Sequence, residues 1–203
     1  MDYLVHYEDG SNGYLSHHGI RGMKWGVWNA ETKRRHGGSL FVSGSSKTQD
    51  KASGYYRRKL PREVRKELKK AIENGDEIIV GDAPGIDRQV QNFLAKRTYP
   101  NVSVYGPDST PRYKAPNNAN EHWKYNPTYD PTKSKHEKGS KEWLADKDIA
   151  MTNASSRGLA VVLDNGANAT RNNVKRLREQ GKDAVVYMLS SEGKRKDRWT
   201  NDV

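Results

Sequence analysis

The sequence predicts a doubly wound α/β domain with about five parallel strands. Three observations support this: short apolar runs recur along the chain, helical apolar periodicity separates them, and glycine-bearing turns follow several of them. Continuous apolar runs without alternation are typical of strands covered on both faces of a parallel sheet. We therefore expect residues 39–189 to form this domain, after an irregular extension over residues 1–38 and before a charged tail over residues 190–203.

The individual elements follow from these patterns. The expected strands cover residues 39–43, 77–81, 101–105, 158–163 and 184–189. The expected helices run from Leu60-Pro61 to a stop at Asn74-Gly75, onward from Ile86, over residues 141–154, and through Val174 and Leu177 to Gly181. Residues 106–140 form a loop too long for a simple connection. Its aromatic residues either stack on a base or pack the loop onto the domain; they are Tyr113, His122, Trp123 and Tyr125, with Tyr105 just before it.

Composition and charge exclude some classes of protein. The 203 residues contain no cysteine, which removes disulfides and thiolate metal sites, and no apolar run of about 18 residues predicts a membrane span. Adjacent His17 and His18 project in different directions, so we expect no metal site, and no cofactor is indicated. The net charge of +11 favours polyanionic partners. Residues 57–70 hold eight Lys or Arg against two Glu, as either a solvated helix face or a nucleic-acid footprint.

Three turns at strand ends are candidates for binding phosphate. In a doubly wound sheet ligands bind beyond the carboxyl ends of the strands, where backbone N–H groups and helix N-termini favour anions. Neither a GxGxxG fingerprint nor a GxxxxGK[ST] loop is present, which excludes ordinary dinucleotide dehydrogenases and P-loop nucleotidases. The candidate residues in these turns are Gly44, Ser45, Ser46, Lys47, Gly81, Asp82, Gly85, Asp87, Asp164, Asn168 and Thr170.

Several of these side chains have a simpler structural interpretation. Asp82 or Asp87 accepts hydrogen bonds from ribose hydroxyls or caps the following helix. Asn168 and Thr170 are a cap and first-turn pair, unless Thr170 donates to a phosphate. The convergence of three turns on one edge of the sheet favours a phosphate site over capping alone.

Four segments together resemble the SLOG superfamily. They are Phe41–Ser45, Val80–Asp87, Gly158–Asp164 and Thr170–Asn173, the last leading to Gly181-Lys182. This Rossmann-like group includes LOG-type phosphoribohydrolases and the DNA-processing protein DprA. The resemblance implies a nucleotide or nucleotide-derived ligand, either sensed as a signal or cleaved at its N-glycosidic bond. Its relatives often pair, which implies a homo-oligomer, and it adds Asn173 to the candidate ligand-binding residues.

Two departures from the family pattern favour binding over hydrolysis. Ala167 and Ala169 stand where the family is usually glycine-rich, and Asn173 stands where LOG-type enzymes carry a catalytic glutamate. Asparagine supplies neither a base nor a negative charge. An N-glycosidase acting on a nucleoside or nucleotide stays the alternative, with Asp82, Asp87 or Glu121 as the carboxylate. A DNA-associated accessory protein that binds nucleic acid through residues 57–70 is a further alternative.

The segment from Leu15 to Val27 resembles a short element at the start of proteins encoded near the head and portal genes of tailed phages. This resemblance implies a phage or prophage origin. Our hypothesis is that the element docks the chain to a head or portal protein, so that it is found in the virion or the host bacterial cytoplasm. The alternative is a disordered leader without a partner. The leading hypothesis is a phage-encoded protein that binds a nucleotide or an ADP-ribose-type ligand and acts against host nucleotide signalling.

Overall fold

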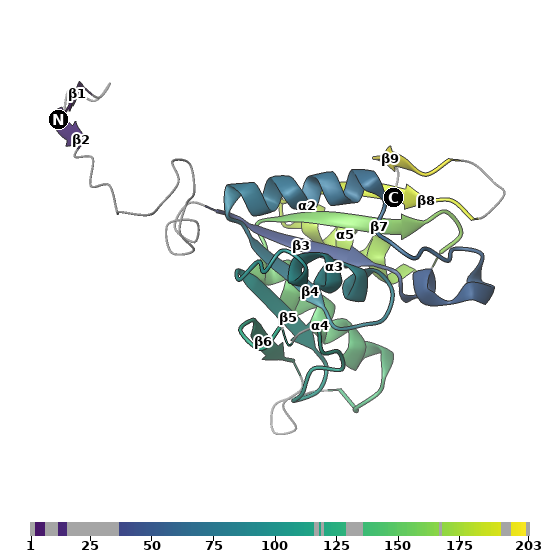
Figure 1. Ribbon diagram of the computed structural model, residues 1–203. Helices are drawn as coiled ribbons and strands as arrows, with labels where there is room; N and C mark the ends of the chain where they lie inside the picture. The colour runs from purple at the N-terminus through teal and green to yellow at the C-terminus, as the bar shows by residue number, and fades with distance from the viewer. Residues whose placement is uncertain are drawn as a thin grey trace.

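The computed structural model describes most of the chain. It describes residues 3–6, 12–15, 37–115, 118, 120–128, 136–166, 168–191 and 196–201. Over these residues the strands form a seven-stranded sheet and a separate two-stranded antiparallel pair (Figure 1). The pair, β1 (Tyr3–His6) and β2 (Asn12–Leu15), lies within the extension for which the sequence predicts no regular structure.

The large sheet has the strand order β6-β5-β4-β3-β7-β8-β9. Its first six strands are parallel and β9 is antiparallel to β8. The strands are β3 (Ser39–Gly44), β4 (Glu77–Gly81), β5 (Val102–Gly106), β6 (Lys124–Pro127), β7 (Arg157–Leu163), β8 (Asp183–Leu189) and β9 (Arg198–Thr200). From β3 the chain winds outward through β4 to β6 and then crosses to β7, so the direction of winding reverses between β3 and β7.

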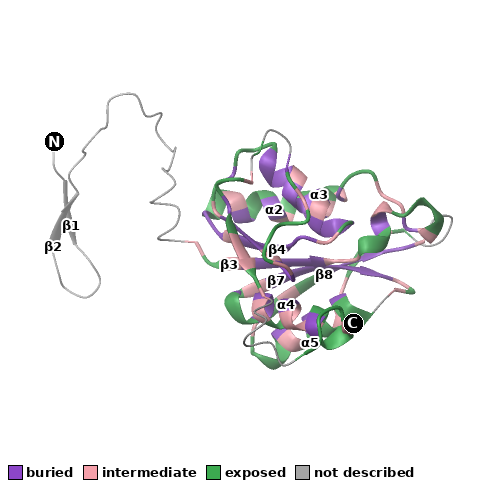
Figure 2. Cartoon of the chain, turned by 90° about the horizontal axis from the view of Figure 1, so that it is seen from below, coloured by how far each residue is buried: buried purple, intermediate pink, exposed green. Residues whose placement is uncertain are grey.

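Helices cover both faces of this sheet, as Figure 2 shows. Two helices, α2 (Arg62–Asn74) and α3 (Ile86–Ala95), cover one face, while α4 (Lys141–Ala154) and α5 (Asn168–Glu179) cover the other. Two short 3₁₀ helices, η1 (Ser46–Gln49) and η2 (Lys51–Ser53), follow β3. The doubly wound, Rossmann-like α/β fold expected from the sequence is therefore confirmed, with two strands more than the five expected.

The core forms where the apolar faces of helices pack on the apolar side chains of the sheet. Val64, Leu68 and Ala71 lie at i, i+4 and i+7 of α2 and are fully buried. They pack in one cluster with alternate residues of the central strands, whereas Phe41 packs on the opposite face with Met151 of α4. The α2 helix ends at Gly75, whose φ of 77° is one that glycine adopts without strain.

The two additional strands lie at the edges of the sheet. β6 falls inside the region expected to be loop, and β9 falls inside the charged tail. Neither has a buried apolar run: β6 reads Lys-Tyr-Asn-Pro, and β9 reads Arg-Trp-Thr. Trp199 of β9 makes an edge-on contact with Tyr187 of β8, at 4.9 Å between ring centroids. Tertiary pairing therefore determines both strands, which periodicity alone does not reveal.

Candidate functional site

A pocket of about 370 Å³ lies at the carboxyl edge of the sheet, where the winding reverses. The turns after β3 and β4, the first turns of α5, the length of α4 and the loop after β5 all contribute to its walls. We call it the switch-point pocket. Its lining residues are Phe41, Ser43, Gly44, Ser45, Ser46, Ala83, Pro84, Asp87, Arg112, Leu144, Lys147, Asp148, Met151, Ala169, Thr170 and Asn173.

The turns after β3 and β4 are in direct contact, and two glycines make this possible. A Cβ at Gly85 would overlap the carbonyl oxygen of Ser45, and Gly85 has a φ of 88°. A Cβ at Gly44 would lie 2.5 Å from the side chain of Ile86. The backbone N–H of Ile86 donates to the Ser45 carbonyl at 3.2 Å, which holds the two turns together. Gly44, Ser45 and Ser46 thereby form one wall of the pocket.

Thr170 and Asn173, from the start of α5, form another part of the wall. Both are buried, with 6% and 3% of their surface exposed. The Asn173 amide donates to Ser43 Oγ at 3.0 Å and its carbonyl oxygen accepts from Arg176 at 2.8 Å, so its orientation is fixed. Thr170 in the first turn of α5 lies where the helix dipole favours an anion.

Asp87, Lys147 and Asp148 form a charged cluster in the same pocket. Only 6% of Asp87 and 7% of Lys147 is exposed, and the Lys147 ammonium donates to Asp148 Oδ1 at 3.0 Å. Burial raises the pKa of Asp87 to about 7, while the charge of Lys147 opposes this rise and that of Asp148 adds to it. Gly81 makes room for the cluster, because a Cβ there would overlap Asp87 and lie 2.9 Å from Lys147 Nζ.

Asp82 lies beside the pocket, where its carboxylate is paired with Arg112. Its side chain is fully buried and forms an ion pair with Arg112, whose Nε donates at 3.1 Å and whose backbone N–H donates at 3.3 Å. The hydrogen bond to Asp82 raises the pKa of Arg112. Asp82 therefore anchors the loop after β5, and the structure does not bring it into the pocket lining.

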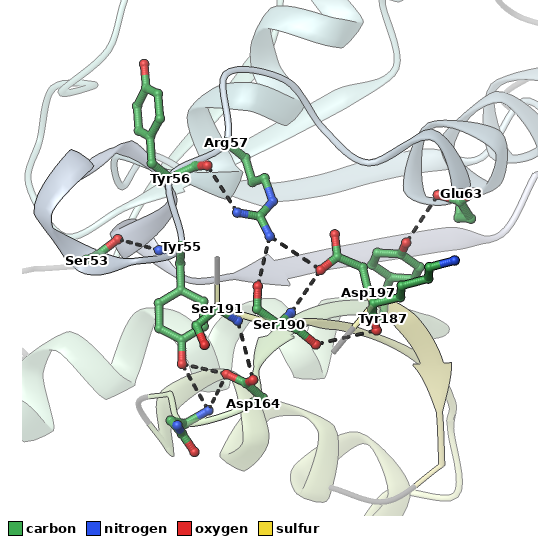
Figure 3. Close-up of polar contacts among 12 residues, drawn as sticks. Ser53, Tyr55, Tyr56, Arg57, Glu63, Asp164, Tyr187, Ser190, Ser191 and Asp197 are labelled. Carbon is green, nitrogen blue, oxygen red and sulfur yellow. Dashed lines mark hydrogen bonds and ion pairs between the residues drawn. The ribbon is translucent and has the colours of Figure 1, made fainter. Parts of the chain in front are cut away.

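Asp164, expected at the same edge, lies outside the pocket lining. Figure 3 shows it accepting a 2.6 Å hydrogen bond from the Tyr55 hydroxyl. It also accepts from the backbone N–H groups of Asn165 at 2.9 Å and Ser191 at 3.4 Å. In the same view Arg57 donates to the Ser190 carbonyl and pairs with Asp197. This network joins the segment after η2 to the ends of β7 and β8.

Three other candidates are also outside the switch-point pocket. Lys47 is exposed on η1, and Asn168 is exposed at the start of α5. Glu121 is exposed and lies just before β6, at the amino edge of the sheet, so it is not near the pocket. A larger hollow of about 540 Å³ lies at that amino edge, with His122 and Lys124 in its wall. It does not contain the strand-to-helix turns that favour phosphate, so we place the candidate site at the carboxyl edge.

Sequence reasoning missed Lys147, Asp148 and Arg112. A signal for Lys147 was present, because Trp143, Lys147 and Met151 occur at i, i+4 and i+8 of α4 and all three are buried. A lysine within the apolar stripe of a helix lies either in the hydrophobic core or at a functional site. Arg112 lies in the loop after β5, and no local pattern indicates its partner Asp82, which is 30 residues away.

Three aromatic residues of the loop after β5, namely Tyr113, Trp123 and Tyr125, pack it onto the domain, whereas His122 is exposed. Trp123 is buried and its indole N–H donates to the Tyr99 carbonyl at 2.9 Å. Tyr113 donates to Asn92, and Tyr125 donates to the Asp108 carbonyl at 2.7 Å. Of the two interpretations of these aromatics, packing accounts for all three side chains.

The described part of the chain contains neither a membrane-spanning helix nor a cluster of metal-ligating side chains. No helix there is long and apolar enough to cross a membrane. No group of three or more His, Asp or Glu residues there is arranged to hold a metal ion.

A family of unknown function (DUF7211) matches residues 8–31 of the chain, which include the element from Leu15 to Val27. Apart from Leu15 that element lies outside the described residues, so its expected docking role stays a prediction. No curated protein matches the chain.

A solved structure of DNA processing protein A from Helicobacter pylori, described for its single-stranded DNA binding mode, is similar in fold. Its TM-score is 0.51 and its sequence identity is 13%, over 76% of this chain and 66% of that chain. At this identity the similarity shows the fold alone. The similarity therefore agrees with the Rossmann-like fold that the sequence resemblance implies.

Proposed function

We propose that the chain binds a nucleotide or a nucleotide-derived molecule, such as an ADP-ribose-type ligand, in the switch-point pocket. The observation that carries the proposal is that two groups of anion-binding donors line one pocket. Gly44, Ser45 and Ser46 come from the turn after β3, and Thr170 comes from the N-terminus of α5. Backbone N–H groups, hydroxyls and a helix N-terminus are the donors that a phosphate requires.

The remainder of the pocket suits the other parts of such a ligand. Leu144, Met151 and Pro84 offer apolar surface for a base, while the carboxylates of Asp87 and Asp148 accept hydrogen bonds from ribose hydroxyls. A volume of about 370 Å³ lies within the range of small-molecule sites, roughly 300–1,000 Å³.

Native mass spectrometry of the protein with a pool of nucleotides, NAD, ADP-ribose and cyclic ADP-ribose tests this proposal. We expect one ligand to be retained unchanged. Thr170→Val removes the wall hydroxyl at nearly constant volume and should weaken retention by about tenfold, the value of one to two lost hydrogen bonds. Thr110→Val is the matched control, because Thr110 is exposed and does not line the pocket. Equal retention by both variants, or no retention by the wild type, would reject the proposal.

The same experiment separates binding from N-glycosidase activity. Of the three carboxylates considered, Asp87 lines the pocket and its pKa is raised to about 7 by burial, as a general acid needs. If the chain is an N-glycosidase, a free base accumulates in the pool and Asp87→Asn abolishes its release. A constant pool supports the binding function.

Nucleic-acid binding is a second candidate, favoured by the exposed cationic face of α2. The exposed cations of this helix are Arg62, Arg65, Lys66, Lys69 and Lys70. The fold similarity to a protein described for binding single-stranded DNA is consistent with it. A cationic helix face binds the phosphate backbone without reading sequence, and such binding weakens steeply as salt rises.

A fluorescence titration with a labelled oligonucleotide at several salt concentrations tests this candidate. Replacing Arg62, Arg65 and Lys69 by Gln should weaken binding and reduce the salt slope by about two to three units. The matched control replaces Lys175, Arg178 and Arg198, three exposed cations outside α2, with the same loss of charge. An equal effect of both triple variants would indicate attraction by net charge without a defined surface.

A further inference from the structure

Two carboxylates in the switch-point pocket share one ammonium group. Lys147 donates to Asp148 Oδ1 at 3.0 Å, and its charge also acts on Asp87. The side chains of Lys147 and Asp148 are 9% and 19% exposed, and Asp87 is 6% exposed, so water screens these charges weakly. With both carboxylates ionised, the cluster therefore carries an uncompensated negative charge.

The other groups around Asp87 do not remove this charge. Asp82, from the turn after β4, is paired with Arg112 from the following loop. The charge of Arg112 also interacts with Asp87, but Arg112 and Asp82 together form a neutral pair. The backbone N–H of Ala83 donates to Asp87 Oδ2 at a long 3.3 Å. From α4, Lys147 and Asp148 offset one another.

An anionic ligand would meet this negative charge directly, because Asp87 and Asp148 line the same pocket as Ser45, Ser46 and Thr170. A proton on the cluster removes the repulsion, and the least solvated carboxyl group accepts it most readily. We propose that the pocket takes up its anionic ligand together with one proton, which Asp87 holds. This inference rests on the proposed function and adds a regulation by pH to it.

The direction in which affinity changes with pH follows from the protonation of Asp87 in the free and in the ligand-bound protein. Burial already raises the pKa of Asp87 to about 7 in the free protein, and a nearby phosphate raises it further. Below about pH 6 the free and bound forms both hold the proton, so affinity changes little. Above pH 7 the proton must be taken from solution, so affinity falls by up to about tenfold per pH unit.

Calorimetric titration with ADP-ribose tests the proposal, because each of its phosphates carries one ester and one anhydride bond and so has no group that titrates near neutral pH. The titration is run from pH 6 to pH 9 in two buffers of different ionisation enthalpy, which gives the number of protons taken up. For the wild type we expect uptake to approach one proton at pH 8 and affinity to fall between pH 6 and pH 9.

Variants of both carboxylates identify the proton acceptor. Asp87→Asn should abolish the uptake and bind more tightly than the wild type at pH 8. Asp148→Asn removes the repulsion on Asp87, so its uptake should move to lower pH. Glu121→Gln, at the opposite edge of the sheet, should keep the wild-type profile. Binding without proton uptake overturns this inference alone, and absence of binding at every pH overturns the proposed function with it.

Discussion

The Tyr55 hydroxyl donates a 2.6 Å hydrogen bond to Asp164, a residue 109 positions further along the chain. Tyr55 is itself 6% exposed and packs in the main core. Through this bond the segment after η2 is attached to the end of β7, beside the strand order reversal (Figure 3). Asp164 thus stabilises the conformation of the turn that follows β7.

Tyr55→Phe should therefore loosen this attachment. The variant keeps the ring in the core and removes one donor from Asp164, which retains the N–H groups of Asn165 and Ser191. We expect a loss of about 1 kcal/mol in the free energy of unfolding, measured by urea denaturation. Tyr56→Phe is the control, because Tyr56 is half-buried next to it in the same segment. Equal stabilities of the two variants would contradict the assigned role.

Gly85→Ala should be strongly destabilising because two costs combine. The residue has a φ of 88° and its Cβ would overlap the Ser45 carbonyl. Gly54→Ala isolates the first cost, since Gly54 has a φ of 71° and a Cβ added there would meet no atom within 4 Å. We expect about 1 kcal/mol for Gly54→Ala and at least roughly twice that for Gly85→Ala by thermal denaturation. Similar losses would show that the contact between the two turns relaxes freely.

Arg112→Ala should leave the Asp82 carboxylate buried without its cation. Because Arg112 is itself partly exposed, we expect a loss of roughly 2 kcal/mol, below the value for a fully buried pair. The double variant with Asp82→Asn should recover part of this loss, since the buried charge is gone. Denaturant unfolding of the two single variants and the double variant gives the coupling energy, and a value near zero would exclude a structural role for the pair.

Asp87→Asn should change the pH dependence of stability. The pKa of Asp87 rises from 3.8 in the unfolded chain to about 7 in the folded protein. Its contribution to stability is therefore fully present below about pH 4 and is lost as pH rises through 7. The variant should gain stability over the wild type by on the order of 4 kcal/mol at pH 8, and show little gain at pH 4. A gain that is constant with pH would be contrary to this prediction.

Much of the fold follows from local pattern. The expected bounds of β4 and α4 agree with the structure, because a continuous apolar run and a well-bounded helical segment leave little choice of register. The structure also brings Gly44, Ser45, Asp87, Thr170 and Asn173 together at one edge, as expected from the carboxyl ends of parallel strands.

What the sequence did not reveal depends on contacts between distant segments. Asp82 and Asp164 each follow an apolar strand, so the local sequence does not distinguish their roles. Their partners come from distant segments: Arg112 pairs with Asp82, and Tyr55 donates to Asp164. Lys147 is buried only because α4 crosses the sheet beside the reversal of winding. A lysine on a helix is usually solvated, so its type alone predicts an exposed position.

Both edges of the sheet are formed by the short strands β6 and β9, and β6 ends in Pro127. Long apolar strands at an edge invite pairing with other molecules, whereas short strands with proline and charged residues discourage it. The three residues of β9 pair with Val186, Tyr187 and Met188 of the seven-residue strand β8 and so cover this part of its edge. A variant truncated after Ser191 would present β8 to its neighbours, and light scattering would reveal the resulting self-association. The three residues of β9 thus prevent the β8 strands of neighbouring molecules from pairing edge to edge.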